Sequence, residues 1–150
     1  MHMAHTTNDI NGFCAEEIFQ LYALVEAYET IGIKSYKTQT SLIREYPELS
    51  SLLSVLKKIK CHYAKPTVMK TIDFKTLENE IYLTEYQIGY LLSLLYHIRN
   101  SIAHACIVKF GDSALITDFK VRRPADFSAR GKISLSIINE FTEILNKIKL

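Results

Sequence analysis

Residues 84–106 read TEYQIGYLLSLLYHIRNSIAHAC and carry the clearest helical pattern in the chain. Thr84, followed three residues later by Gln87, forms a capping-box pattern that marks a helix start. Apolar residues then recur at helical spacing along the stretch: Ile88, Leu91, Leu92, Leu95, Ile98, Ile102 and Cys106. The pattern predicts a central helix of about 20 residues or more that ends near Ala105.

Three polar residues near the end of this predicted helix fall away from its apolar stripe. With Arg99 set at 0° and about 100° per residue, Asn100 lies near 100° and His104 near 140°, whereas the stripe spans about 260–340°. Asn100 and His104 are i,i+4 neighbours and can touch. The same arc also holds less polar residues: Leu92, Tyr96 and Ala103. Two interpretations stay open: an ordinary solvated face, or a contact surface that includes a site.

The remaining segments predict a single domain over residues 1–150 that is mainly helical. Residues 1–10, which open with MHM, are expected to be disordered or partly a tag. The other predicted elements are helices at 15–33 and about 40–62, a loop with at most a short helix at 63–80, a β-hairpin around Gly111-Asp112, a basic loop after it, and a closing amphipathic helix at 132–150. We therefore expect one compact helical domain with a small inserted hairpin.

Composition limits the class of protein and its compartment. The 150 residues are 48% hydrophobic and 23% charged, which suits a globular chain. Polar residues interrupt every apolar run before it reaches the roughly 20 residues that span a bilayer. The N-terminal MHMAHTTND lacks the cationic start and apolar core of a signal peptide. We expect a cytoplasmic protein without a membrane partner.

The net charge of +2 is unevenly distributed along the chain. Residues 1–30 contain five acids and no Lys or Arg, whereas the segment 120–132 contains five basic residues and one acid, Asp126. The basic residues are Lys120, Arg122, Arg123, Arg130 and Lys132. Such a segment could neutralise phosphates, but a solvated loop is the favoured interpretation of the segment taken alone.

Metal and nucleophilic chemistry fit the central stretch poorly. Cys14, Cys61 and Cys106 form no C-x-x-C pair, so they are expected to be buried free thiols and not zinc ligands. His97 and His104 have no acidic residue beside them between positions 86 and 111, and Cys106 falls on the apolar stripe, away from His104. We expect neither a metal nor a cofactor.

Arg, Asn and His on one face do suit phosphoryl transfer on RNA. Histidine exchanges a proton near neutral pH, and arginine binds a phosphate with two hydrogen bonds while it stabilises developing negative charge. An asparagine amide can orient either group.

Arg99-Asn100 followed by His104, late on a long helix and ahead of a hairpin and a final helix, resembles the signature of the HEPN superfamily. In that family an arginine, usually followed by a polar residue, precedes a histidine by four to six positions. The resemblance covers about residues 15–150. It implies a mainly α, up-and-down bundle of four to five helices, with the hairpin added after the motif helix.

The resemblance also implies a homodimer in which the two motif helices meet across a two-fold axis. Catalytic members are metal-independent endoribonucleases found in toxin–antitoxin modules, phage defence and RNA processing. Carried onto this chain, His104 is the general acid/base, Arg99 stabilises charge on the phosphate, and Asn100 orients them. The expected substrate-binding residues are Tyr96, Arg122, Arg123 and Arg130. The expected partners are RNA and an antitoxin or another regulatory protein.

One departure from the family concerns regulation, since some HEPN toxins carry a modifiable tyrosine just before the histidine, where this chain has Ala103. The motif also occurs in members that only dimerise or bind RNA or nucleotides. A non-catalytic interaction module is therefore the alternative function, and a plain helical scaffold with a wet polar arc is the third.

Overall fold

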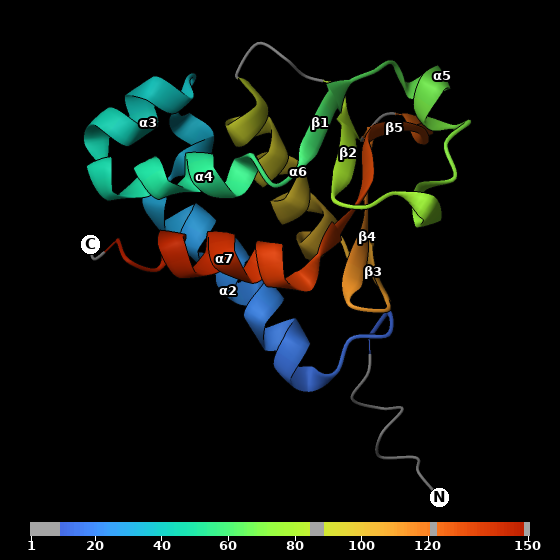
Figure 1. The fold of residues 1–150 in the computed structure, drawn as a ribbon, viewed down its shortest axis with the longest axis horizontal. Coiled ribbons are helices and arrows are strands. Elements are labelled where there is room, and N and C mark those ends of the chain that lie inside the picture. Colours follow the sequence, from blue (N-terminus) through green and yellow to red (C-terminus); the bar gives the residue numbers. More distant parts are fainter. Residues whose placement is uncertain (1–9, 85–88, 121–122, 149–150) are drawn as a thin grey trace, which may run out of the picture.

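A computed structural model describes residues 10–84, 89–120 and 123–148, and Figure 1 shows its ribbon. The predicted tag or disordered segment therefore lies almost entirely outside the described residues. The described elements, with η for 3-10 helices, are α2 (Ala15–Ile31), η1 (Ile33–Ser35), α3 (Gln39–Glu45), η2 (Pro47–Ser51), α4 (Leu52–Leu56), β1 (Lys60–Tyr63), α5 (Pro66–Met69), η3 (Phe74–Thr76), β2 (Glu80–Leu83), α6 (Gly89–Ala103), β3 (Ile107–Phe110), β4 (Ser113–Lys120), β5 (Arg123–Ser134) and α7 (Leu135–Leu145).

The strands form one five-stranded sheet in the order β1-β2-β5-β4-β3. β1 and β2 are parallel, and the other three pairings are antiparallel. The predicted hairpin at Gly111-Asp112 is present as β3–β4, but it is the edge of this larger sheet. The fold is mixed α/β, so the prediction of a mainly α bundle of four to five helices is wrong.

The largest correction concerns β5, which occupies the segment that was expected to be a basic loop. Burial alternates along it: Ala129, Gly131 and Ile133 are buried, whereas Arg130 and Lys132 are partly exposed. This two-residue period is that of a strand with one face on the core. The basic side chains concealed it, because they lie on the opposite face of a central strand.

Two further segments differ from the sequence-based expectation. The helix predicted at about 40–62 is three short helical pieces, α3, η2 and α4, and its last residues form β1. The expected loop at 63–80 contains α5 and η3 and leads into β2. A strand of four residues carries too few positions for alternation to stand out from helical spacing.

The helices α2, α6 and α7 lie together beside one face of the sheet, as Figure 1 shows. α6 contacts α2 and β4, α7 contacts α2 and β5, and α3 and α4 contact α6 as well. Buried residues of α6 and α7 meet those of the sheet in one continuous core, for example Leu95, Ile98, Ile116, Ile133 and Phe141. The opposite face of β5 is contacted by α5 and η3.

Local signals explain where the first and last helices begin. The carboxylate of Glu17 accepts a hydrogen bond from the Cys14 backbone N–H at 3.0 Å, which caps the start of α2. Gly32 ends α2 in the left-handed region, with φ of 75°. The Ser134 hydroxyl accepts a bond from the Ile137 N–H at the start of α7. Within the described ranges, no helix combines the length and apolar composition needed to cross a membrane.

Candidate functional site

The predicted motif lies at the C-terminal end of α6. Ala105 has a left-handed backbone with φ of 55°, and the Cys106 N–H donates a hydrogen bond to the Ser101 carbonyl at 2.7 Å. This geometry ends the helix directly after Ala103. His104 therefore stands on the rim of the helix end, where it is exposed, with its N–H still bonded to the Asn100 carbonyl. Of the start predicted at Thr84–Gln87, Thr84 is described, and its backbone N–H and hydroxyl both donate to the Ser128 carbonyl of β5, whereas residues 85–88 lie outside the described residues.

Arg99 joins α6 to α2. Its guanidinium is paired with the Glu29 carboxylate and donates a hydrogen bond to the Asn100 side-chain oxygen at 2.9 Å. The Arg99 side chain is 29% exposed, so part of it faces solvent. Two acceptors therefore hold this guanidinium in one direction, and part of its surface stays available to a ligand.

The Asn100 amide links Arg99 to a buried acid on the sheet. Its Nδ2 donates to Asp118 Oδ2 at 3.1 Å, while its Oδ1 accepts from Arg99. These two bonds fix which way the amide is turned. Asp118 is only 5% exposed, because it extends from the core face of β4 towards α6.

Asp118 also binds His97, which is 1% exposed. The His97 Nδ1 lies 2.7 Å from Asp118 Oδ2. Because an ionised carboxylate can only accept, Nδ1 carries the proton in this contact. We call the chain of contacts Glu29–Arg99–Asn100–Asp118–His97 the Asp118 network. It runs from the surface of α2 through α6 to Asp118 on β4 and returns to α6 at His97.

Three buried polar atoms in or beside this network have no hydrogen-bond partner within the described part of the chain. They are Arg99 Nε, His97 Nε2 and the hydroxyl oxygen of Ser93, which is one helical turn before His97. The side chains of Ser93 and His97 are buried, with Ser93 0% exposed. A serine, a histidine and an aspartate (Ser93, His97 and Asp118) are therefore close to one another, but all three are buried, so a substrate has no access to them.

Tyr96 lies one turn before Arg99 and borders a pocket of about 240 Å³ between α6, α2 and η1. The ring of Tyr96 meets the His97 ring edge-on at 5.2 Å, and the Lys34 ammonium lies 5.9 Å from its centre. The pocket is lined by Tyr28, Ile33, Lys34, Tyr36, Lys37, Leu92 and Tyr96. Aromatic and basic side chains are thus combined next to Arg99.

The structure brings some predicted residues together and separates others. Arg99 and Asn100 are in direct contact, Tyr96 lies on the same helix, and His104 directly follows its last residue. Asn100 differs from the wheel-based expectation, since it is 8% exposed and faces Asp118 instead of solvent. The angular projection of the helix misplaced Asn100 because α6 packs against neighbouring elements on several sides and has no wide face open to solvent.

The basic residues predicted to guide RNA are not beside this helix end. Arg130 is next to Ala129, which pairs with Asp118, so Arg130 projects from the sheet face away from α6. Its guanidinium donates to the Met69 and Ile72 carbonyls. Arg122 and the side chain of Arg123 lie outside the described residues.

Three members of the Asp118 network escaped the sequence-based prediction: Glu29, His97 and Asp118. A signal for Asp118 was present, because it follows Ala114 and Ile116 at two-residue spacing on the buried side of a strand. An acid at such a position needs a buried partner. Within the described ranges, no group of three or more His, Cys, Asp or Glu residues is placed to hold a metal ion.

The cysteines also differ from the expectation of buried thiols. All three are free, Cys14 is exposed, and Cys61 and Cys106 are half-buried. Burial raises the pKa of the Cys61 thiol to about 11.

Comparison of the chain with known protein families, with curated proteins and with solved structures gave no match.

Proposed function

We propose that this protein is a metal-independent endoribonuclease that acts in the cytoplasm as a homodimer formed through α6, in a toxin–antitoxin or phage-defence setting. One observation carries the proposal: a part-exposed guanidinium, Arg99, is held by Glu29 and Asn100 near the end of α6, and an exposed histidine, His104, follows five residues later, directly after the helix. A fixed cation and an imidazole that exchanges protons are the two kinds of group that metal-independent RNA cleavage can use.

The reaction is an attack of the ribose 2′-oxygen on the adjacent phosphorus. A general base removes the 2′-hydroxyl proton, the new P–O bond forms, and the bond to the 5′-oxygen breaks as that oxygen receives a proton. The products are a 2′,3′-cyclic phosphate and a 5′-hydroxyl. His104 acts on these protons, and Arg99 binds the phosphate oxygens while charge accumulates on them.

Asn100 acts in this proposal as a positioning residue. It is buried, and it connects Arg99 to Asp118, so its contribution is to fix the guanidinium and not to touch RNA. The pocket beside Tyr96 would receive an RNA base next to the scissile phosphate. Lys34 and Lys37, which also line this pocket, would then lie near the RNA backbone. The proposed RNA path runs over these lysines and not over Arg130, which is on the other side of the sheet.

The dimer is part of the proposal because one helix end presents an open surface. Ala103, the last residue of α6, and His104, which follows it, are exposed, and Tyr22 is 49% exposed on the adjacent α2. Two such surfaces, joined by a two-fold axis, would bring two Arg99 and His104 pairs towards one phosphate. Small residues such as Ala103 permit the close approach of a second helix.

Cleavage of a labelled RNA in the presence of EDTA tests this function. We expect activity that EDTA does not remove and that falls at least about 100-fold in His104→Ala, the usual contribution of a general acid or base. Arg99→Ala should also lose activity, whereas Arg44→Ala, a change of an exposed arginine on α3, should not. Equal cleavage of an all-deoxy substrate, or an undiminished His104→Ala variant, would refute the mechanism.

A non-catalytic interaction module is the second candidate, favoured by the internal pairing of Arg99. Its charge is met by Glu29, and Asn100 is buried, so the same contacts could serve only to fix α6 against α2 and β4. The two functions separate experimentally. A purified dimer that never cleaves RNA, and whose self-association weakens in Arg99→Ala, would favour the module.

A further inference from the structure

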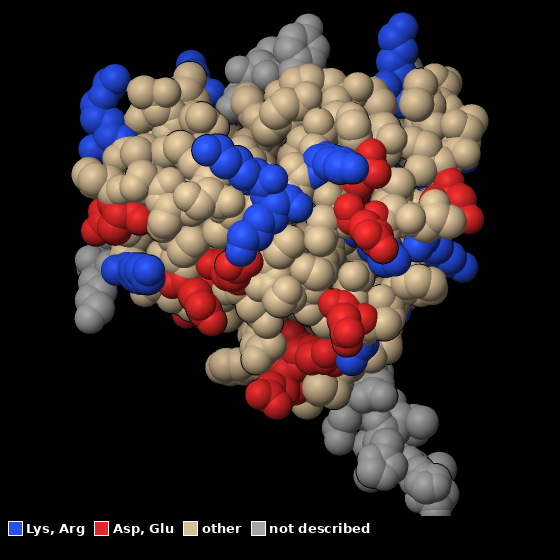
Figure 2. Space-filling view, viewed as in Figure 1, with Lys and Arg blue, Asp and Glu red and all other residues tan. Residues whose placement is uncertain are grey.

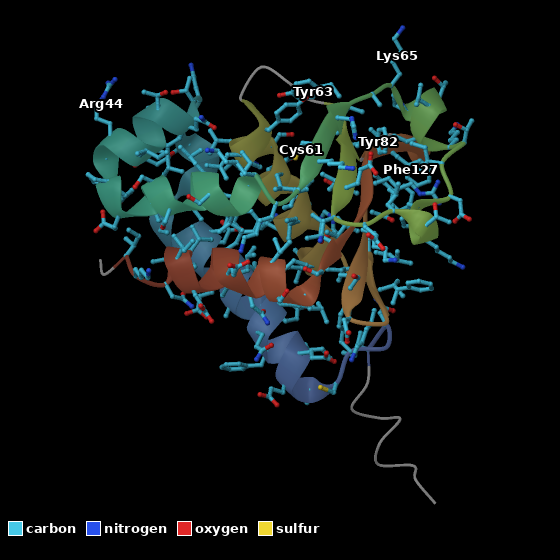
Figure 3. The ribbon with its side chains drawn as sticks, viewed as in Figure 1. Arg44, Cys61, Tyr63, Lys65, Tyr82 and Phe127 are labelled. Atoms are coloured by element: carbon cyan, nitrogen blue, oxygen red, sulfur yellow. The ribbon has the colours of Figure 1, made fainter. Side chains whose placement is uncertain are left out.

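An open groove of about 720 Å³ lies at the β1–β2 end of the sheet, remote from the chemistry proposed for α6. It is lined by His62, Tyr63, Ala64, Lys65, Pro66, Val68, Tyr82 and Thr84. Figure 3 labels Tyr63, Lys65 and Tyr82, which come from β1, the turn after it and β2. His62 pairs with Tyr82 and Tyr82 with Arg130 across the strands, so their side chains share the sheet face away from α6.

Aromatic rings dominate this groove. His62 and Tyr82 stack with ring centres 4.6 Å apart and planes 23° from parallel. Tyr63 stacks on Tyr90 of α6 at 4.1 Å and 14°. The rings are still accessible: the side chain of His62 is 42% exposed, and Tyr63 is 38% exposed. Paired rings fixed on strands offer flat surfaces at little cost in side-chain entropy.

Hydrogen bonding fixes the floor of the groove further. The Glu80 carboxylate holds the His62 ring through Nε2 at 2.5 Å. Burial raises the pKa of the Tyr82 hydroxyl, and the Glu80 carboxylate raises it further through its charge and a hydrogen bond with this hydroxyl. Glu80 thus contacts both rings of the His62–Tyr82 stack and holds them in place.

The chain around the groove is strongly basic. Residues 57–75 contain six lysines and one acid, Asp73. All six lysines are exposed: Lys57, Lys58, Lys60, Lys65, Lys70 and Lys75. Figure 2 shows basic side chains gathered over the end of α4 and the start of β1, with more at the upper edge beside α5. Lys58 is paired with Glu140, whereas Lys65 lines the groove itself and supplies the kind of charge that a phosphate backbone requires.

The segment after β1 is anchored and forms a fixed wall. The Arg130 guanidinium donates to the Met69 carbonyl at 3.0 Å and lies 3.9 Å from the Phe74 ring centre and 4.6 Å from that of Phe127. α5 and η3 are therefore tied to β5. A pre-formed groove binds a ligand without first having to order a loop.

From these observations we infer that the β1–β2 groove binds unpaired bases of single-stranded RNA, with Tyr82 and His62 as the stacking surface and Lys65 facing the phosphates. The inference does not depend on cleavage at α6. A duplex keeps its base faces hidden within the stack, whereas a single strand can turn a base onto an aromatic ring. Lysines around rings suit this ligand better than an uncharged peptide.

Binding of a fluorescein-labelled 12-nucleotide RNA, measured by fluorescence anisotropy, tests the inference. All its riboses carry 2′-O-methyl groups, so it cannot be cleaved by 2′-oxygen attack. We expect Tyr82→Ala to weaken binding about 10-fold or more, the range for loss of one base stack, and Tyr82→Phe to keep most of the affinity. Lys65→Glu should weaken binding and reduce its salt dependence, whereas Arg44→Glu should change neither.

The two proposals fail separately in this design. His104→Ala should bind the RNA with the affinity of the wild type, because His104 follows the C-terminal end of α6 and does not line the groove. Two outcomes would refute RNA binding in the groove. One is that the wild-type protein binds no RNA, and the other is that Tyr82→Ala and Lys65→Glu bind RNA with the affinity of the wild type. Equal affinity for a duplex or for a free mononucleotide would refute the inference as well. If Tyr82→Ala unfolds, Lys65→Glu still tests the groove, because Lys65 is exposed and its substitution should leave folding intact. Thermal melting of each variant checks this point.

Discussion

Replacement of Asp118 by alanine is the sharpest test of how α6 is held in place. Asp118 accepts hydrogen bonds from His97 at 2.7 Å and from Asn100 at 3.1 Å, and all three side chains are at least nine-tenths buried. The substitution leaves two buried donors without an acceptor, and each costs about 1–3 kcal/mol. We expect the free energy of unfolding to fall by about 3–5 kcal/mol, the range found when one partner of a buried pair is removed.

The expected loss is large compared with the stability of a domain of this size, about 5–15 kcal/mol. It corresponds to a decrease in melting temperature of about 6–20 °C, at roughly 2–4 °C per kcal/mol for a chain of this length. Urea denaturation followed by circular dichroism gives the free energy directly. Asp112→Ala is the matched control, because Asp112 is an exposed acid at the turn of the hairpin that contains β4.

A double-mutant cycle assigns the effect to the Asp118 network. In a His97→Phe background, one of the two donors is gone, so Asp118→Ala should cost less by about 0.5–3 kcal/mol. A loss of less than about 1 kcal/mol for Asp118→Ala in the wild-type background would contradict the network. Equal losses in the two backgrounds would show that His97 does not contribute.

Three further outcomes test other parts of the structure. Because burial raises the pKa of Cys61 to about 11 from 9.0, its thiolate fraction at pH 8 is about 100-fold below that of an ordinary thiol, and alkylation followed by mass spectrometry should find it far slower than exposed Cys14. The hydrogen bond from Lys109 holds the pKa of Glu17 below its usual 4.5, so this pair adds stability above that pH and loses it as the pH falls further. The melting temperatures of wild type and Glu17→Gln should therefore differ at pH 7 and converge in acid. A Cβ on Gly131 would lie 2.5 Å from a β2 carbonyl oxygen, so Gly131→Ala should lower the free energy of unfolding by about 2 kcal/mol or more in a urea titration.

The elements with long, regular patterns were the predictable part of this fold. α2 and α6 have enough turns for apolar spacing to repeat, and the β3–β4 hairpin has alternating strands around a Gly-Asp turn. β1 and β2 have four residues each, and they pair with each other across 16 intervening residues. Nothing in the local sequence specifies that pairing, because it depends on the sheet as a whole.

The candidate site was predicted in part for a similar reason. Arg99, Asn100 and His104 stand close together in sequence, so their residue types suggested chemistry directly. Glu29 and Asp118, which fix Arg99 and Asn100, lie far along the chain and are joined to them only by folding. A helical wheel assigns one side to the core and one to solvent, and it therefore cannot place a residue such as Asn100 on a helix enclosed by the sheet and by other helices.

The position of β5 in the sheet has a consequence for how the chain reaches its folded state. β5 is the last strand in sequence, but it lies between β2 and β4. Until residues 123–134 pair, β1–β2 and β3–β4 are separate half-sheets, and β2 and β4 each carry an unpaired edge. Such edges are the surfaces on which chains associate with one another. Folding should therefore be governed by a late, long-range insertion step, and the time that this step takes is the interval in which the chain is most exposed to aggregation.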